Sequence, residues 1–171
     1  IMAREAASAS ELLAQQLMLN HESCERIAQK IQLLNPSVVY IVARGSSDHA
    51  GVFAKYLIEV ELGIPVVGAA PSVVAVAATK SYLACLSALL QLVAYCKKDS
   101  ELMVAVSEIP RALSLAVSGP KQLHADMFKD CDKCIVLGRG FGYAIAKEVA
   151  LKLKEVCAIQ AEAFSSAEFV H

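Results

Sequence analysis

Three charged side chains recur along one predicted helix in the last third of the chain. Glu148, Lys152 and Glu155 stand at positions i, i+4 and i+7, so all three project from one face of that helix. A carboxylate–ammonium–carboxylate array can move a proton beside a carbonyl group, because charged neighbours and apolar walls tune a glutamate toward neutral pH. The same spacing is typical of a solvated face with a Glu–Lys pair, and spacing alone favours that second interpretation.

A second candidate site follows a predicted strand, where residues 44–47 read Arg-Gly-Ser-Ser and open a helix. The first amides of a helix have no partners within it, and the helix dipole adds positive charge, so this turn can hold a phosphate. The Ser46 and Ser47 hydroxyls could donate to that phosphate, but serine is also a preferred helix cap, which leaves both interpretations open. His49 is as compatible with a surface or capping role as with approach to a bound phosphate.

Two further motifs suggest cofactor or metal binding. Gly138-x-Gly140-x-Gly142 faintly resembles a dinucleotide-binding turn. That fold needs an acidic residue after its second strand, and here the corresponding strand ends in Gly-Ala-Ala, so we expect no NAD and no other cofactor. Cys131-x-x-Cys134 could be half a zinc site or a redox pair. No second Cys or His pair follows at ligand spacing, so we expect structural cysteines and no metal.

Hydrophobic periodicity predicts the elements that position these residues. Helices are expected over 3–34, 48–62, 79–96, 100–117 (with a kink or boundary near Pro110) and 143–157. Continuous apolar runs at 38–43, 66–68 and 134–137 are typical of strands buried in a parallel sheet, and the strand–helix–strand order predicts an α/β fold. Residues 158–171 are expected to be irregular or short-helical.

The chain also contains an internal repeat. Residues 39–45 and 134–140 each combine an apolar run with a small residue, arginine and glycine, and each precedes a predicted helix. We interpret them as two copies of one α/β unit.

Composition excludes several classes of protein. Hydrophobic residues make up 56% of the 171 residues and charged residues 19%, which excludes disorder. The net charge of −1 provides no electrostatic basis for nonspecific nucleic-acid binding. The longest helix-compatible apolar stretch, between Lys80 and Lys97, falls short of the roughly 20 residues that cross a bilayer. With no secretory signal visible, we expect a cytoplasmic protein without nucleic-acid or membrane partners.

Three stretches of sequence can be compared with known families. Residues 43–47 read Ala-Arg-Gly-Ser-Ser, residues 76–80 read Val-Ala-Ala-Thr-Lys, and residues 150–171 run from Ala-Leu-Lys-Leu-Lys-Glu to Glu-Phe-Val-His. Together they resemble the sugar isomerase (SIS) family over nearly the whole chain. The last stretch is the most specific: it is similar to the isomerase domain of glutamine–fructose-6-phosphate amidotransferases and to glucosamine-6-phosphate deaminases of the SIS type.

The resemblance implies a three-layer α-β-α, flavodoxin-like parallel sheet in a double-SIS architecture that is incompletely represented. Residues 1–118 would hold the N-terminal helices and the first SIS domain, and residues 119–171 the start of a second, truncated one. The family carries a phosphate loop and further strands between the segments that end and begin here at residues 74 and 75. We therefore expect a segment of a longer protein to be missing there.

The resemblance also implies roles for the charged residues. Glu155 would be the base that moves a proton between C1 and C2 of an open-chain hexose phosphate, with Lys152 and Glu148 in support. His171 would assist ring opening, typically across the interface of a homodimer.

For substrate binding, the resemblance implies that Ser47 contacts the sugar phosphate, together with Ser46 and Gly45 of the same turn. Val76 would line the sugar pocket. The substrate would be a small-molecule sugar phosphate, and neither a metal nor a nucleotide would take part.

These expectations favour a deaminase that converts glucosamine 6-phosphate to fructose 6-phosphate and ammonia, since no glutamine-hydrolysing domain is visible. One alternative is another SIS-type aldose–ketose isomerase or an aminotransferase-like protein. A second is a non-catalytic SIS module that senses a sugar phosphate. Such a module would not need Glu148, Lys152, Glu155 and His171 together.

Overall fold

The structure is a computed structural model that describes residues 2–69, 79–121 and 123–169. Three predictions fall outside these ranges. They are the break near residues 74–75 and the roles of Val76 and His171.

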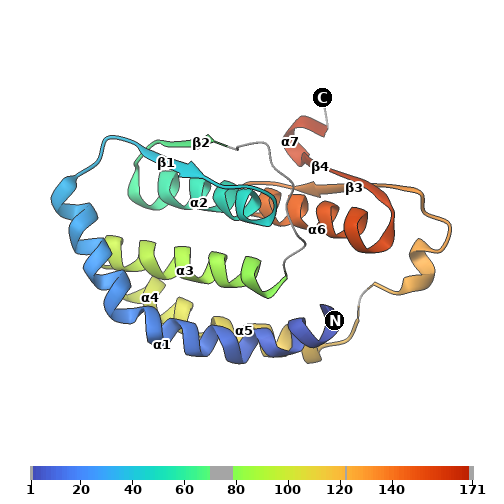
Figure 1. Ribbon diagram of the computed structural model, residues 1–171, viewed down its shortest axis with the longest axis horizontal. Helices are drawn as coiled ribbons and strands as arrows, with labels where there is room; N and C mark the ends of the chain where they lie inside the picture. Colours follow the sequence, from blue (N-terminus) through green and yellow to red (C-terminus); the bar gives the residue numbers. More distant parts are fainter. Residues whose placement is uncertain (1, 70–78, 122, 170–171) are drawn as a thin grey trace.

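Two β-α-β units form one side of the molecule (Figure 1). In the first, β1 (Val39–Val42) and β2 (Val66–Ala69) pair in parallel on either side of α2 (Ser46–Leu62) in the sequence. In the second, β3 (Lys133–Gly138) and β4 (Gln160–Ser165) pair in parallel around α6 (Phe141–Cys157). Each unit is therefore a two-stranded parallel sheet with its own crossover helix.

The two units match position for position. Val39 pairs with Val66 in the first unit, and Cys134 pairs with Ala161 in the second. Each residue of the second pair stands 95 positions after its counterpart in the first pair. Gly45 (φ 56°) and Gly140 (φ 54°) hold the same left-handed turn conformation before their helices. The internal repeat predicted from the sequence is confirmed, and it extends over the whole β-α-β unit.

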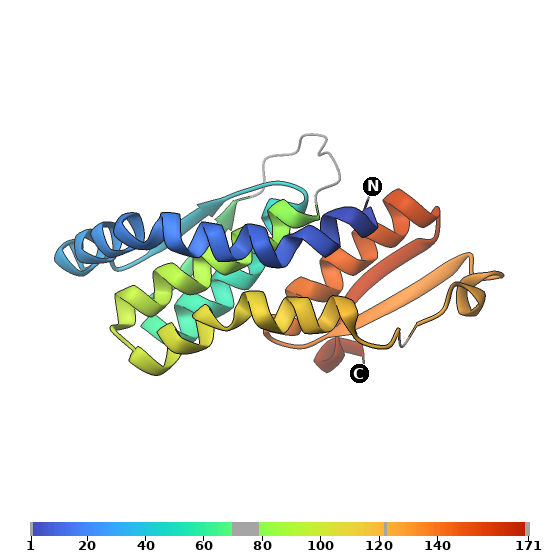
Figure 2. The same ribbon diagram turned by 90° about the horizontal axis from the view of Figure 1, so that it is seen from below.

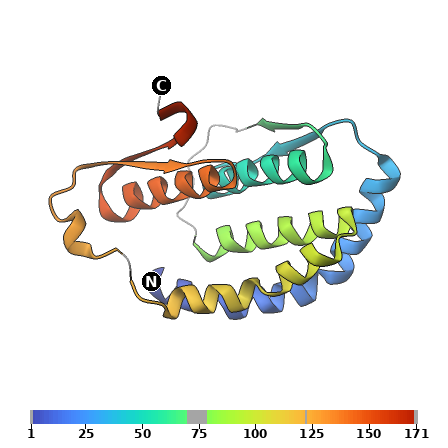
Figure 3. The same cartoon turned by 180° about the vertical axis from the view of Figure 1, so that it is seen from behind.

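Four further helices pack on the side of α2 and α6 that faces away from the strands (Figures 1 and 3). They are α1 (Met2–Leu34), α3 (Lys80–Lys97), α4 (Ser100–Ser107) and α5 (Ile109–Ser118). α3 lies between α2 and α1, while α5 runs beside α1, as the view from below shows (Figure 2). Asp99 caps α4 by accepting from Leu102 N (2.9 Å), and Pro110 lies in the first turn of α5.

The core lies where α2, α3 and α6 meet. Its buried side chains come from all three helices: Ala50, Phe53, Leu57, Tyr82, Leu86, Val93 and Ala144. Among the described residues, helices cover one face of the strands, while the other face carries exposed apolar side chains such as Tyr40 (68% exposed) and Val42 (69%). The α/β class with parallel strands is confirmed, and of the three predicted layers the described residues form the strands and one layer of helices.

One local prediction is wrong in part. The tail was expected to be irregular or short-helical, but residues 160–165 form a strand, β4, paired with β3. The short-helical part of the prediction is confirmed by α7 (Ser166–Phe169). The alternation Gln-Ala-Glu-Ala-Phe-Ser has few β-branched residues, so its strand character comes from pairing with β3 and not from intrinsic preference. The boundary predicted near Pro110 within 100–117 is confirmed, because this stretch forms two helices, α4 and α5, which meet at Glu108.

Candidate active site at the junction of the two units

Glu148 of α6 forms the centre of a buried polar cluster between α2 and α6. Its Oε1 accepts from Ser46 Oγ at 2.9 Å and from Lys152 Nζ at 3.1 Å. Its Oε2 lies 2.8 Å from His49 Nδ1, which donates because an ionised carboxylate can only accept. Both oxygens of a residue that is only 6% exposed are thus fixed by side chains from two helices.

The charge of Glu148 is maintained in spite of its burial. Burial raises the pKa of the Glu148 carboxyl, but hydrogen bonds from His49, Ser46 and Lys152 lower it by more, so the pKa lies below its usual value. Nearby on α3, burial and the Glu148 charge raise the pKa of Tyr82 to about 12. The neutral Tyr82 hydroxyl donates to Ala144 O (3.2 Å) and so joins α3 to α6 close to the cluster.

Lys152 connects this buried cluster to a more accessible carboxylate. Its Nζ lies 3.1 Å from Glu148 Oε1 and 3.1 Å from Glu155 Oε2. Exposure rises along the series, with side-chain values of 8% for Glu148, 15% for Lys152 and 25% for Glu155. Within the described residues, Glu155 Oε1 has no hydrogen-bond partner, so this oxygen is free to act on a bound molecule.

The turn at residues 44–47 lies at the N-terminal end of α2, but its two serines have different partners. Ser46 is buried and donates to Glu148. Ser47 is exposed, and its Oγ donates to Arg44 O (2.7 Å) and accepts from Arg44 N (3.1 Å) within the turn. The Ser47 N–H and the Asp48 N–H also bond to the turn carbonyls of Arg44 and Gly45. A phosphate would have to replace these internal bonds in order to use the Ser47 hydroxyl.

The structure therefore brings Glu148, Lys152, Glu155 and Ser46 together, with Ser47 and Gly45 on the adjoining turn. His49 is an additional member that the sequence left undecided. Its position three residues after Ser46, on the same face of α2, is the signal that could have identified it. Tyr82 is a second addition, and no spacing in the sequence relates it to the array.

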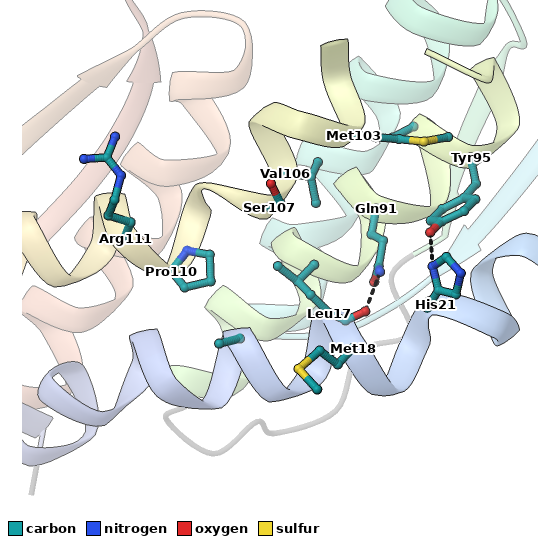
Figure 4. A pocket seen from close by; sticks show the side chains of 12 residues that line it. Leu17, Met18, His21, Gln91, Tyr95, Met103, Val106, Ser107, Pro110 and Arg111 are labelled. Atoms are coloured by element: carbon teal, nitrogen blue, oxygen red, sulfur yellow. Dashed lines mark hydrogen bonds between the residues drawn. The ribbon is translucent and has the colours of Figure 1, made fainter. Parts of the chain in front are cut away.

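Of the concave regions in the part of the chain that the structure describes, two are lined mainly by apolar side chains. A cavity of about 690 Å³ between α1, α3, α4 and α5 is lined mainly by apolar side chains, with the His21–Tyr95 hydrogen bond and Gln91 in its wall (Figure 4). A second cavity, of about 450 Å³, reaches Ser47 but is otherwise lined by apolar side chains of β1, α2 and α3. An apolar lining does not suit a phosphate.

The described residues contain no group of three or more His, Cys, Asp or Glu side chains that could hold a metal ion. None of their helices combines the length and apolar character needed to cross a bilayer. The six cysteines are present as free thiols.

With the geometry established, solved structures define the class of the fold. A candidate phosphosugar isomerase from Silicibacter pomeroyi DSS-3 superposes with a TM-score of 0.89 and 26% identity, over 99% of this chain and 72% of that one. The C-terminal domain of glucosamine-fructose-6-phosphate aminotransferase from Francisella tularensis has the same fold (TM-score 0.71, 21% identity), over 99% of this chain and 71% of that one. The fold is that of sugar isomerase (SIS) domains.

Sequence comparison then identifies particular relatives. Glutamine–fructose-6-phosphate aminotransferase [isomerizing] of Vibrio parahaemolyticus is 37% identical over 109 residues, and that of Escherichia coli K12 is 33% identical over 108 residues. Each match covers 57% of this chain but only 18% of the relative. No family model matches the chain. Sequence and fold together confirm the predicted resemblance to SIS domains and to the isomerase part of these aminotransferases.

Proposed function

We propose that the chain is an aminohexose-phosphate isomerase/deaminase that converts glucosamine 6-phosphate and water to fructose 6-phosphate and ammonia. The observation that carries the proposal is the Glu148–Lys152–Glu155 array, in which a buried carboxylate holds an ammonium group against a more exposed carboxylate. The aminotransferase relatives and the phosphosugar isomerase neighbour support a sugar phosphate as the substrate.

In the proposed reaction, Glu155 acts as the base on the open-chain sugar. Its free oxygen removes the proton from C2, the C2–H electron pair forms the C1–C2 double bond, and the aldehyde oxygen at C1 takes up a proton. Glu155 then returns its proton to C1, the oxygen at C1 remains as a hydroxyl, and C2 becomes an imine. Water adds to C2 of this imine and ammonia leaves, which gives the ketose.

Lys152 and Glu148 support this step without exchanging the proton. The Lys152 ammonium fixes Glu155 Oε2, so the carboxylate presents its other oxygen to the substrate. Glu148 cannot serve as the base, because Ser46, Lys152 and His49 occupy both of its oxygens. Ring opening by His171, the phosphate contact of Ser47 and the sugar contact of Val76 remain part of the proposal, as does a homodimer with the site near its interface.

The first prediction concerns Glu155. Glu155→Gln keeps the size of the side chain but removes the base, and positioned acid–base groups contribute about 10²- to 10⁴-fold to a rate. We expect ammonia release from glucosamine 6-phosphate to fall at least about 100-fold. The matched control is Glu11→Gln on the exposed surface of α1, which should leave the rate unchanged. Equal rates for the wild type and Glu155→Gln would remove Glu155 from this role.

The alternatives give different results in the same experiment. Another aldose–ketose isomerase would interconvert glucose 6-phosphate and fructose 6-phosphate, again with loss of activity in Glu155→Gln, but would release no ammonia. A sensing module would be stabilised against heat by sugar phosphate without turning it over.

A further inference from the structure

The side chain of His49 contacts Glu148 directly, although the fold of helix α2, which carries it, does not require a histidine at this position. The second β-α-β unit builds the same turn and helix with Ala144 at the equivalent position, 95 residues later. A small apolar residue therefore suffices for the local fold. His49 is half-buried, and its Nδ1 lies 2.8 Å from Glu148 Oε2. The hydrogen-bond partner of the imidazole therefore belongs to the second unit and not to the unit that contains His49.

Three side chains of different chemistry bond to the two carboxylate oxygens of Glu148. Ser46 and Lys152 both approach Oε1, whereas His49 alone approaches Oε2 among the described residues. If His49 is removed, Oε2 becomes a buried acceptor without a donor. The carboxylate can then recover a partner for Oε2 by rotating toward Lys152, whose ammonium lies 3.1 Å from Oε1.

Lys152 is shared, so any such rotation reaches the proposed base. The same Nζ that bonds to Glu148 also holds Glu155 Oε2, at 3.1 Å in both cases. A Glu148 carboxylate that turns toward Lys152 draws the ammonium away from Glu155. A displacement of about 1 Å at a reacting group can cost about 100-fold in rate.

We propose that His49 is a positioning residue: by fixing Glu148 from α2, it sets the place of Lys152 and hence of Glu155 on α6. This inference rests on the proposed function for its kinetic consequence, although the His49–Glu148 contact is independent of it. The titratable groups around the contact are Lys152 and Glu155 on α6, Tyr82 on α3, and the Asp48–Lys147 pair that joins α2 to α6 beside it.

The test compares His49→Ala with His49→Asn. His49→Ala copies the residue of the second unit and removes the donor, while the amide N–H of His49→Asn can replace Nδ1–H. We expect His49→Ala to lower kcat about 10- to 100-fold with KM changed less than about 2-fold, and His49→Asn to recover most of kcat. The control is His124→Ala, an exposed histidine in the segment before β3, which should leave both constants unchanged.

A second measurement follows Glu148 itself, by ¹³C NMR titration of labelled glutamate carboxyls in the same variants. Loss of the His49 bond should move the Glu148 midpoint to higher pH, and His49→Asn should move it back. If the wild type shows no turnover but the Glu148 midpoint shifts in His49→Ala, the proposed function fails while the positioning contact stands. An unchanged Glu148 midpoint in His49→Ala, or an unchanged kcat in an active protein, overturns the proposal.

Discussion

Glu148 combines burial with a full set of hydrogen bonds, and this makes its ionisation a contribution to folding. In the folded chain its pKa lies below the ordinary value of 4.5, because the bonds from His49, Ser46 and Lys152 exceed the effect of burial. An acid with a depressed pKa stabilises the fold at pH values above its unfolded pKa, and this stabilisation is lost as pH falls through the folded pKa.

We therefore expect Glu148→Gln to lower the free energy of unfolding by about 2 kcal/mol near neutral pH, since it leaves buried donors poorly paired. The difference from the wild type should narrow as pH falls below 4.5 and through the lowered pKa of Glu148, where the wild-type carboxyl also becomes protonated. Urea unfolding at a series of pH values measures this difference. Glu22→Gln on the exposed surface of α1 is the control, and a difference independent of pH would contradict the prediction.

At the scale of elements, the packing of α2 against α6 contains two equivalent contacts, one between apolar side chains and one between polar side chains. Phe141 is equivalent by the repeat to Ser46, and Phe53 is equivalent to Glu148. The two phenylalanine rings pack with centroids 5.3 Å apart, while Ser46 donates to Glu148 at 2.9 Å. One end of the helix pair is thus an apolar contact that holds the units together, and the other is the polar cluster of the candidate site.

The second unit also requires a closer approach of helix to strand than the first. A Cβ on Gly138 would lie 2.6 Å from the carbonyl carbon of Gly142 and 2.8 Å from Tyr143 Cα, both backbone atoms of α6 that cannot move alone. Gly138→Ala should therefore cost about 3 kcal/mol in unfolding free energy. Gly68→Ala on β2 has no atom within 4 Å of the added Cβ and should change stability by less than about 1 kcal/mol. Similar midpoints for the two variants in urea would refute this.

The elements show where sequence reasoning works and where it fails. Long amphipathic helices have strong hydrophobic periodicity, and β1 and β3 are continuous apolar runs, so the existence and order of these elements could be predicted. β4 could not, because its polar alternation becomes a strand only by pairing with β3. The Glu148–Lys152–Glu155 array was visible because it lies on one helix. Its partners His49 and Tyr82 come from other helices, so only the packing of α2 and α3 on α6 reveals them.

At the scale of the whole molecule, the apolar face of the strands is the most prominent exposed surface. Tyr40, Val42 and Val67 of the first unit and Ile135, Leu137 and Phe164 of the second are all more than a third exposed. Monomeric proteins rarely expose apolar patches of this kind without a partner. The predicted homodimer and the predicted domain division both stay predictions. Either a second copy of the chain or a further domain would be expected to cover this apolar face.

We expect the chain to self-associate with rising concentration, and the double substitution Tyr40→Thr, Val42→Thr to weaken that association at least about 10-fold, since it removes much of the apolar area of β1. Analytical ultracentrifugation over a concentration series measures the effect. Leu33→Thr on α1 removes a more exposed apolar side chain on a separate surface and serves as the control. Equal association in all three proteins would show that the strand face takes no part.

The position of Glu148 between the two units has a practical consequence. Its donors Ser46 and His49 come from one unit, and Lys152 comes from the other, so its titration depends on how the two units are set against each other. A change of a few tenths of an ångström between α2 and α6 alters hydrogen bonds at both oxygens. The titration midpoint of the Glu148 carboxyl, measured in solution, therefore reports the alignment of the two units. It should shift with any ligand, partner or mutation that turns one unit relative to the other.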